Sequence, residues 1–118
     1  MQEEIKRRTK RIGLEVIKLI DELPNKLSAR AIGNQIIRSS TSIGANYRAA
    51  CRAKSTADFV NKLKIVEEET DETIYWLEVL VESGLVLKER LSGLLSETNE
   101  VLSIIVASIN TIKNRKSA

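Results

Sequence analysis

Apolar residues along this chain recur at helical spacing in four separate stretches. In the first, Ile5, Ile12, Val16 and Leu19 follow one another at intervals of three, four or seven residues. Such intervals place side chains on one face of a helix. The stretches with this spacing, each predicted to be a helix, are residues 3–23, 28–53, 56–83 and 88–112.

Start and stop signals separate these stretches. Pro24 cannot continue a helix, and it ends the first one. Ser28 has the side chain of a helix N-cap and predicts the start of the second. Ser55 and Asp58 form a Ser-x-x-Asp pattern typical of a helix start, and Gly84 predicts a left-handed C-cap. The polar tail from Lys113 is expected to fray.

Four helices with short corners predict an all-α fold, an antiparallel up-down-up-down four-helix bundle. The chain has 118 residues, five glycines and one proline, so little of it can be irregular. Its length suits one domain spanning residues 1–118.

The stretch from Ser39 to Gly44 is unusual for a helix because its side chains are small and mostly hydroxylated. Such residues have low helix propensity, and they allow a neighbouring backbone to come close. Their hydroxyls can bond to carbonyls one turn earlier. We therefore predict a tight helix–helix contact here.

The third predicted helix has two apolar or mixed stripes, whereas a surface helix needs one. The first runs from Phe59 through Leu63 and Val66 to Leu80 and predicts the inner seam of the bundle. The second predicts contact with another subunit. The expected subunit-interface residues are Ile65, Glu69, Glu72, Trp76 and Val79, together with Arg48 of the second helix.

Charge is unevenly distributed along the chain. The net charge is +3, but residues 1–66 carry +8 (14 basic against 6 acidic) and residues 67–118 carry −5 (5 against 10). This asymmetry favours self-association or an anionic partner, although solvated helix faces are the commoner explanation for charge runs. The candidate nucleic-acid-binding residues are Lys6, Arg7, Arg8, Lys10, Arg11, Arg52 and Lys54.

Two interpretations apply to the arginines of the second helix. Arg38, Arg48 and Arg52 share a sector of the helical wheel and can pair with carboxylates at Glu69 and Glu72, within the bundle or across subunits. Alternatively, they form a polyanion-binding surface. Structural pairing is the favoured interpretation for Arg48. No aromatic residue is interleaved with these arginines, which argues against single-strand recognition by base stacking.

The composition argues against an enzyme, a cofactor and a metal site. There is no histidine, the commonest general base, and no glycine-rich phosphate loop. The lone Cys51 excludes an intrachain disulfide, fits a reducing compartment and is expected to be a small core group. The carboxylates of the third helix point around it and do not converge. No apolar run has transmembrane length, which predicts a cytoplasmic protein without membrane contact.

The central segment resembles a known family. Arg38-Ser-Ser-Thr-Ser-Ile-Gly-Ala-Asn46, followed by Tyr47 to Ser55 and by Asp71-Glu72 to Trp76-Leu77-Glu78, is similar to four-helix-bundle proteins encoded in intervening sequences of bacterial 23S ribosomal RNA genes. The family often has Ala-Glu-Gly after the Asn-aromatic or Asn-aliphatic pair, where this chain has Arg48-Ala49-Ala50. The resemblance implies a homopentamer in a family with no established enzymatic activity. It also implies kinship with accessory proteins of diversity-generating retroelements, which bind a reverse transcriptase and nucleic acid.

Two functional hypotheses follow. The leading one is a non-catalytic oligomeric scaffold with weak, salt-sensitive binding of RNA or DNA. The alternative is a protein-interaction adaptor whose charged faces serve self-assembly and a protein partner, without nucleic-acid binding.

Overall fold

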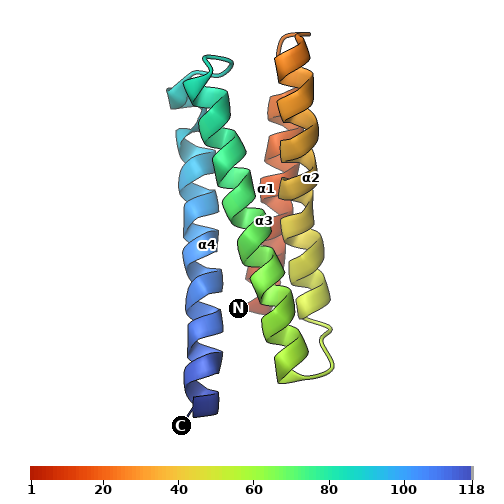
Figure 1. Cartoon of the computed structure of the whole chain (residues 1–118), viewed down its shortest axis with the longest axis vertical. Helices are drawn as coiled ribbons and strands as arrows, with labels where there is room; N and C mark the ends of the chain where they lie inside the picture. The colour runs from red at the N-terminus through yellow and green to blue at the C-terminus, as the bar shows by residue number, and fades with distance from the viewer. Residues whose placement is uncertain (118) are drawn as a thin grey trace.

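The chain forms four α-helices joined by short loops. In the computed structural model, which describes residues 1–117, the helices are α1 (Gln2–Asp21), α2 (Leu27–Ala50), α3 (Thr56–Glu82) and α4 (Lys88–Ser117). Figure 1 shows that the loops alternate between the two ends of the molecule, so that each helix runs back along the one before it. The predicted all-α class with four helices is confirmed.

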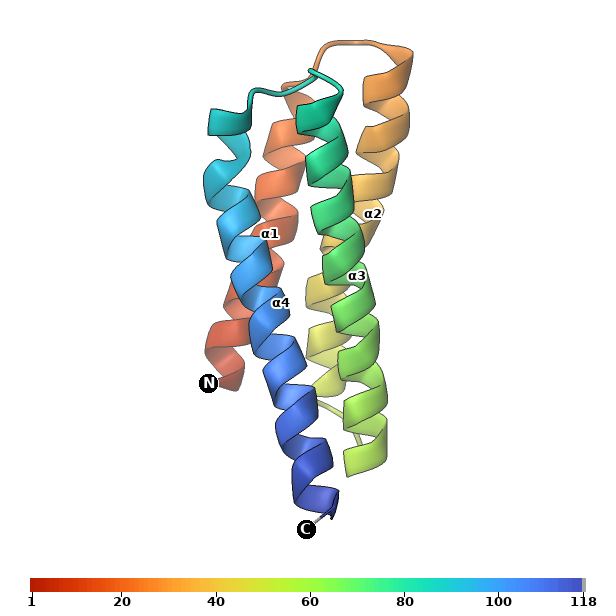
Figure 2. The ribbon, with the colours of Figure 1, turned by 60° about the vertical axis from the view of Figure 1, so that its left-hand side comes forward.

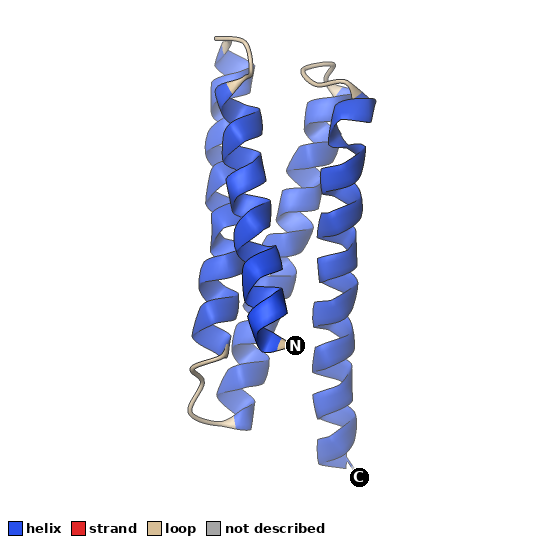
Figure 3. Ribbon diagram, turned by 180° about the vertical axis from the view of Figure 1, so that it is seen from behind, coloured by secondary structure: helices blue, strands red, loops and turns tan. Residues whose placement is uncertain are grey.

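The molecule is elongated, with extents of 51 × 21 × 21 Å. The lengths of its helices are unequal: α1 has 20 residues and α4 has 30. At ~1.5 Å per residue, α1 is about 15 Å shorter than α4. Figures 2 and 3 show that the N-terminus therefore lies partway along the bundle, short of the end where the C-terminus lies.

The start of α2 differs from the prediction. The N-cap is Lys26, in extended conformation and without a side-chain cap, and Ser28 lies inside the helix. The turn after the first helix explains the difference, because the Lys26 N–H donates to the Pro24 carbonyl at 2.9 Å. The Lys26 carbonyl then accepts the N–H of Arg30 at 3.0 Å, which starts the helix two residues early.

The signals around α3 are confirmed. The Ser55 hydroxyl accepts the backbone N–H of Asp58 at 3.1 Å, as expected of an N-cap. Gly84, just after the C-cap Ser83, has a φ of +81°, the left-handed conformation that favours glycine.

The C-terminal end differs from the prediction, because α4 continues through the tail to Ser117. The tail contains no proline or glycine, and cations such as Lys113 and Arg115 are favourable at the negative end of a helix dipole. Ala118 lies outside the described residues.

The core consists of two apolar clusters along the bundle axis. One contains Ile43, Leu63 and Ile105, and the other contains Ile36, Leu77 and Leu91. Between them lies a belt of buried hydroxyl residues, one or two from each of three helices: Ser39 and Ser40, Thr70 and Thr73, and Thr98.

The hydroxyls of the belt are satisfied inside the protein. Thr70 and Thr98 donate to carbonyls one turn earlier, at 2.6 and 2.7 Å. The Thr73 hydroxyl lies 2.9 Å from the hydroxyl of Ser39, which joins α3 to α2. No buried side-chain polar atom of the described residues lacks a partner, so the belt carries no desolvation penalty from unpaired groups.

The small residues of α2 also bring α1 close, as predicted. A Cβ atom added to Gly44 would lie 3.2 Å from the backbone nitrogen of Lys10, and one added to Gly13 would lie 3.4 Å from the carbonyl oxygen of Ser40. The backbones of α1 and α2 are thus in near contact, and a larger side chain at Gly44 has no room.

This packing predicts opposite effects for two glycine substitutions. Gly44→Leu should lower the free energy of unfolding by about 1–3 kcal/mol, because the new side chain forces α1 away from α2. Gly93 lies mid-helix with no atom within 4 Å of an added Cβ, so Gly93→Ala should raise stability by about 1 kcal/mol through helix propensity. Urea denaturation of both variants measures this, and equal effects would contradict the close contact.

Candidate nucleic-acid interface

A groove runs along the surface between α1 and α2. Its lining includes small residues, among them Gly13, Thr41, Gly44 and Ala45, together with the apolar Leu14 and Ile17, and its volume is about 660 Å³. The residues that permit the close approach of the two helices therefore also leave the surface above that contact hollow.

Five basic side chains line this groove. Lys6, Arg7 and Lys10 come from α1, and Arg48 and Arg52 come from α2. Glu3 is the one acidic residue among the lining residues, and it pairs with Lys6 at 3.1 Å. Within the described residues, none of the remaining four makes an ion pair, so the groove presents uncompensated positive charge.

The positive surface continues over α2 to the start of α3. A second groove, of about 410 Å³, is lined by Arg48 and Arg52 again and by Lys54 and Lys62. Asp58, also in its lining, pairs with Lys62 at 2.6 Å, and this bond holds the pKa of the Asp58 carboxyl below its usual range. Arg48 and Arg52 thus stand on a ridge between two basic grooves.

The run Lys6 to Arg11 is divided by the helix into two sides. Lys6, Arg7 and Lys10 line the α1–α2 groove, whereas Arg8 and Arg11 lie toward α4. The Arg8 guanidinium binds both oxygens of Glu97, at 2.7 and 2.9 Å, and also contacts Glu100 at 3.1 Å. Within the run itself the sequence has no acidic residue, but the fold brings Glu97 and Glu100 from α4 to Arg8.

The Arg8–Glu97 contact has electrostatic consequences for both partners. The Arg8 side chain is 17% exposed, and its hydrogen bond to Glu97 raises its pKa. The same bond holds the pKa of the Glu97 carboxyl below its usual value near 4.5, with Arg11 adding a smaller effect. Arg8 therefore serves the α1–α4 seam and is not free for a phosphate.

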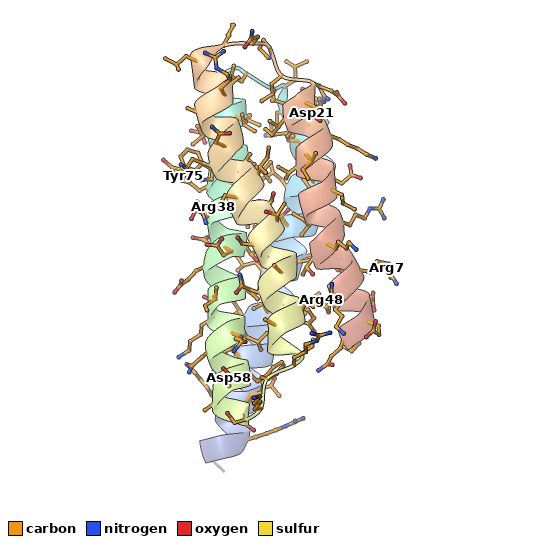
Figure 4. All side chains as sticks on the ribbon, turned by 90° about the vertical axis from the view of Figure 1, so that its right-hand side faces the viewer. Arg7, Asp21, Arg38, Arg48, Asp58 and Tyr75 are labelled. Atoms are coloured by element: carbon orange, nitrogen blue, oxygen red, sulfur yellow. The ribbon has the colours of Figure 1, made fainter. Side chains whose placement is uncertain are left out.

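The predicted pairing with Glu69 and Glu72 is made by Arg38. Its guanidinium contacts Glu69 at 3.1 Å and also binds Glu72. The Arg38 bond lowers the pKa of the Glu72 carboxyl, and a hydrogen bond from Trp76 contributes further. Figure 4 shows Arg38 on the α3 side of α2 and Arg48 on the α1 side. Although Arg38 and Arg48 share one sector of the helical wheel of α2, their long side chains point toward different neighbouring helices.

The second stripe of α3 is partly covered by its own chain. Trp76 is half-buried against the apolar cluster of Leu77 and Leu80, and its indole N–H donates to Glu72 at 3.1 Å. Val79 is half-buried as well. Ile65 stays 42% exposed, and Tyr75, whose ring meets Trp76 edge-on at 5.0 Å, is 56% exposed.

Cys51 is half-buried beside the core cluster that contains Ile43, Leu63 and Ile105, as expected for a small core group. Tyr47 next to it is almost fully buried. Burial raises the pKa of Tyr47 to about 12, with a smaller contribution from Cys51, so the phenol stays neutral at physiological pH.

The part of the chain that the structure describes contains neither a cluster of metal ligands nor a membrane-spanning helix. No group of three or more potential metal ligands converges there. None of its helices is long and apolar enough to cross a membrane.

The sequence did not single out Lys62, which lines the second groove. For Arg48, structural pairing is the favoured interpretation and a polyanion surface the alternative, and the fold places this side chain in the lining of both grooves together with Arg52. The spacing of Arg48 and Arg52, one helical turn apart, was the available signal, because such residues lie above one another on a helix.

These features define a class: a small four-helix bundle with a basic groove between its first two helices. The 23S rRNA-intervening sequence protein family matches residues 1–107, and the chain belongs to that family.

A solved relative supports the assignment. The chain is similar to a crystal structure of a protein with unknown function, from the S23 ribosomal protein family of Bacteroides thetaiotaomicron VPI-5482. The two share 33% identity over 92% of this chain and 97% of the other, with a TM-score of 0.85. Among curated proteins, none matches the chain.

The α1–α4 ion pair predicts loss of stability in acid. The pKa of Glu97 is lower in the folded protein than in the unfolded chain. Its contribution to the free energy of unfolding is therefore fully present above pH about 4.5, and it is lost as the pH falls below that value. Glu97→Gln should reduce stability at pH 7 and flatten its decline in acid.

Denaturant titrations at pH 7 and in acid provide the measurement. Glu68→Gln on the exposed side of α3 is the matched control and should follow the wild type at both pH values. An unchanged pH dependence in Glu97→Gln would show that the Arg8 pair contributes nothing to folding.

Proposed function

We propose that this protein is a non-catalytic scaffold that binds RNA or DNA weakly and in a salt-sensitive manner. The observation that carries the proposal is the α1–α2 groove, where Arg7, Lys10, Arg48 and Arg52 stand without acidic partners among the described residues. Cations in rows are what phosphate backbones require, and this attraction weakens steeply with salt.

The proposal extends to assembly and location. The scaffold is an antiparallel up-down-up-down bundle that associates with copies of itself, as a homopentamer, in the cytoplasm. The exposed side chains of Ile65 and Tyr75 on α3 support self-association, because an interface that buries large apolar side chains removes them from water. A reverse transcriptase or another protein is a further partner that the family resemblance implies.

Arg48→Glu tests the nucleic-acid part. Placing a carboxylate between two basic grooves should weaken binding of structured RNA at low salt by tenfold or more, while the oligomer stays intact. Lys64→Glu is the control: it makes the same charge change on the exposed side of α3, away from both grooves, and should bind like the wild type. Gel shift measures binding, and light scattering measures mass.

The same experiment distinguishes the nucleic-acid-binding scaffold from the alternative, a protein-interaction adaptor. A protein-interaction adaptor would show no retention of RNA in the wild type, and Arg48→Glu would dissociate the oligomer. Wild-type protein that fails to shift structured RNA at low salt contradicts the proposed nucleic-acid binding.

Ile65→Glu tests the assembly part. A charge at this exposed position of α3 should dissociate the oligomer into single chains with unchanged helix content, because burying an unpaired carboxylate at an interface is unfavourable. Leu87 is also exposed, in the loop before α4, and Leu87→Glu should leave the mass unchanged. Size-exclusion chromatography with light scattering measures both, and a wild-type protein that elutes as a monomer refutes the assembly.

A further inference from the structure

Resting on the proposed function, we infer that the α1–α2 groove takes the sugar-phosphate backbone of a double-stranded nucleic acid and does not read the bases of a single strand. Four features of the groove support this: the position of the aromatic residues, the closed floor, the two rows of cations, and the distribution of acidic residues.

The aromatic side chains lie away from the basic surface. Single-strand binders stack bases on exposed aromatic rings along a basic track. Here Tyr47 is buried, Trp76 is half-buried with its N–H bonded to Glu72, and Phe59 faces α4 at the far side of α3. Tyr75 is exposed, but Figure 4 shows it on α3, on the side opposite Arg7. Among the described residues, no aromatic side chain lines the groove.

The floor of the groove is closed to an inserted base. Gly44 and the Lys10 backbone are already so close that an added Cβ would lie 3.2 Å away. A flat ring cannot enter between helices packed this tightly without separating them. Contacts from above, to a phosphate backbone, need no such opening.

The cations form two parallel rows. Lys6 and Lys10 are one turn apart on α1, and Arg48 and Arg52 are one turn apart on α2, which gives about 6 Å between members of a row. Packed helices lie about 8–10 Å apart. The grooves of a DNA duplex are about 6 and 12 Å wide, so one row can meet each strand across a groove.

Acidic residues are nearly absent from this face. Glu3 at the edge of the groove pairs with Lys6. The carboxylates of α4 that could compensate the run on α1 bind Arg8, on the other side of that helix. A duplex carries more negative charge per unit length than a single strand. A basic face with few carboxylates therefore favours the duplex.

The test is fluorescence anisotropy at low salt with a short labelled duplex and with one of its strands alone. Wild-type protein should bind the duplex about tenfold more tightly than the strand. Removing either row, with Lys6→Gln/Lys10→Gln or with Arg48→Gln/Arg52→Gln, should bring this ratio close to one. The matched control Lys18→Gln/Lys64→Gln removes two cations outside both grooves and should keep the ratio.

Salt dependence provides a second readout. For the duplex, log affinity falls linearly with log salt concentration. Each cation removed from a row should make this slope shallower by about 0.9 for every protein chain that contacts the duplex. Circular dichroism establishes that the variants are folded.

The outcomes separate the two proposals. A ratio that the row variants leave unchanged overturns the inference, because charge density alone then explains the preference. A strand that binds as tightly as the duplex overturns it too, while the proposed function stands. If neither ligand binds to the wild type, the proposed function itself fails.

Discussion

The near contact of α1 and α2 is the constraint on which the rest of the structure depends. Glycines at positions 13 and 44 let the two backbones meet, and the hydroxyl belt next to them keeps the waist of the bundle free of bulky side chains. Two consequences follow. The helices are fixed relative to each other, because a close-packed contact has little freedom to slide. The surface above the contact is hollow, so that cations of α1 and α2 border a groove.

The arginines of α1 and α2 fall into two groups: some form ion pairs within the bundle, and others border the groove. Arg8 and Arg7 are neighbours in sequence, yet Arg8 binds Glu97 across the α1–α4 seam and Arg7 borders the groove. Arg38 and Arg48 show the same division on α2. In each case the arginine facing the acidic half of the chain is neutralised. The positive charge that remains is concentrated on the α1–α2 face.

Much of this fold could be predicted from the sequence, because helical periodicity and capping are local. The inner stripe of α3, the Ser55 cap and the turn at Gly84 follow from neighbouring residues alone. The start of α2 could not be predicted, since a turn bond to the Pro24 carbonyl decides it. The division of the cations was also hidden, because it depends on which helices lie next to α1 and α2, and a helical wheel does not contain that information.

The same reasoning applies to the second stripe of α3. Its pattern predicted a partner helix from another chain, but Arg38 already pairs with Glu69 and Glu72, and Trp76 is half-buried within its own chain. Ile65 and Tyr75 are the large apolar side chains of α3 that remain exposed. In Figure 4 Tyr75 lies on the side of the bundle opposite Arg7. An assembly that covers Tyr75 would leave the α1–α2 groove of every copy open, so association there and nucleic-acid binding in that groove would not compete for one surface.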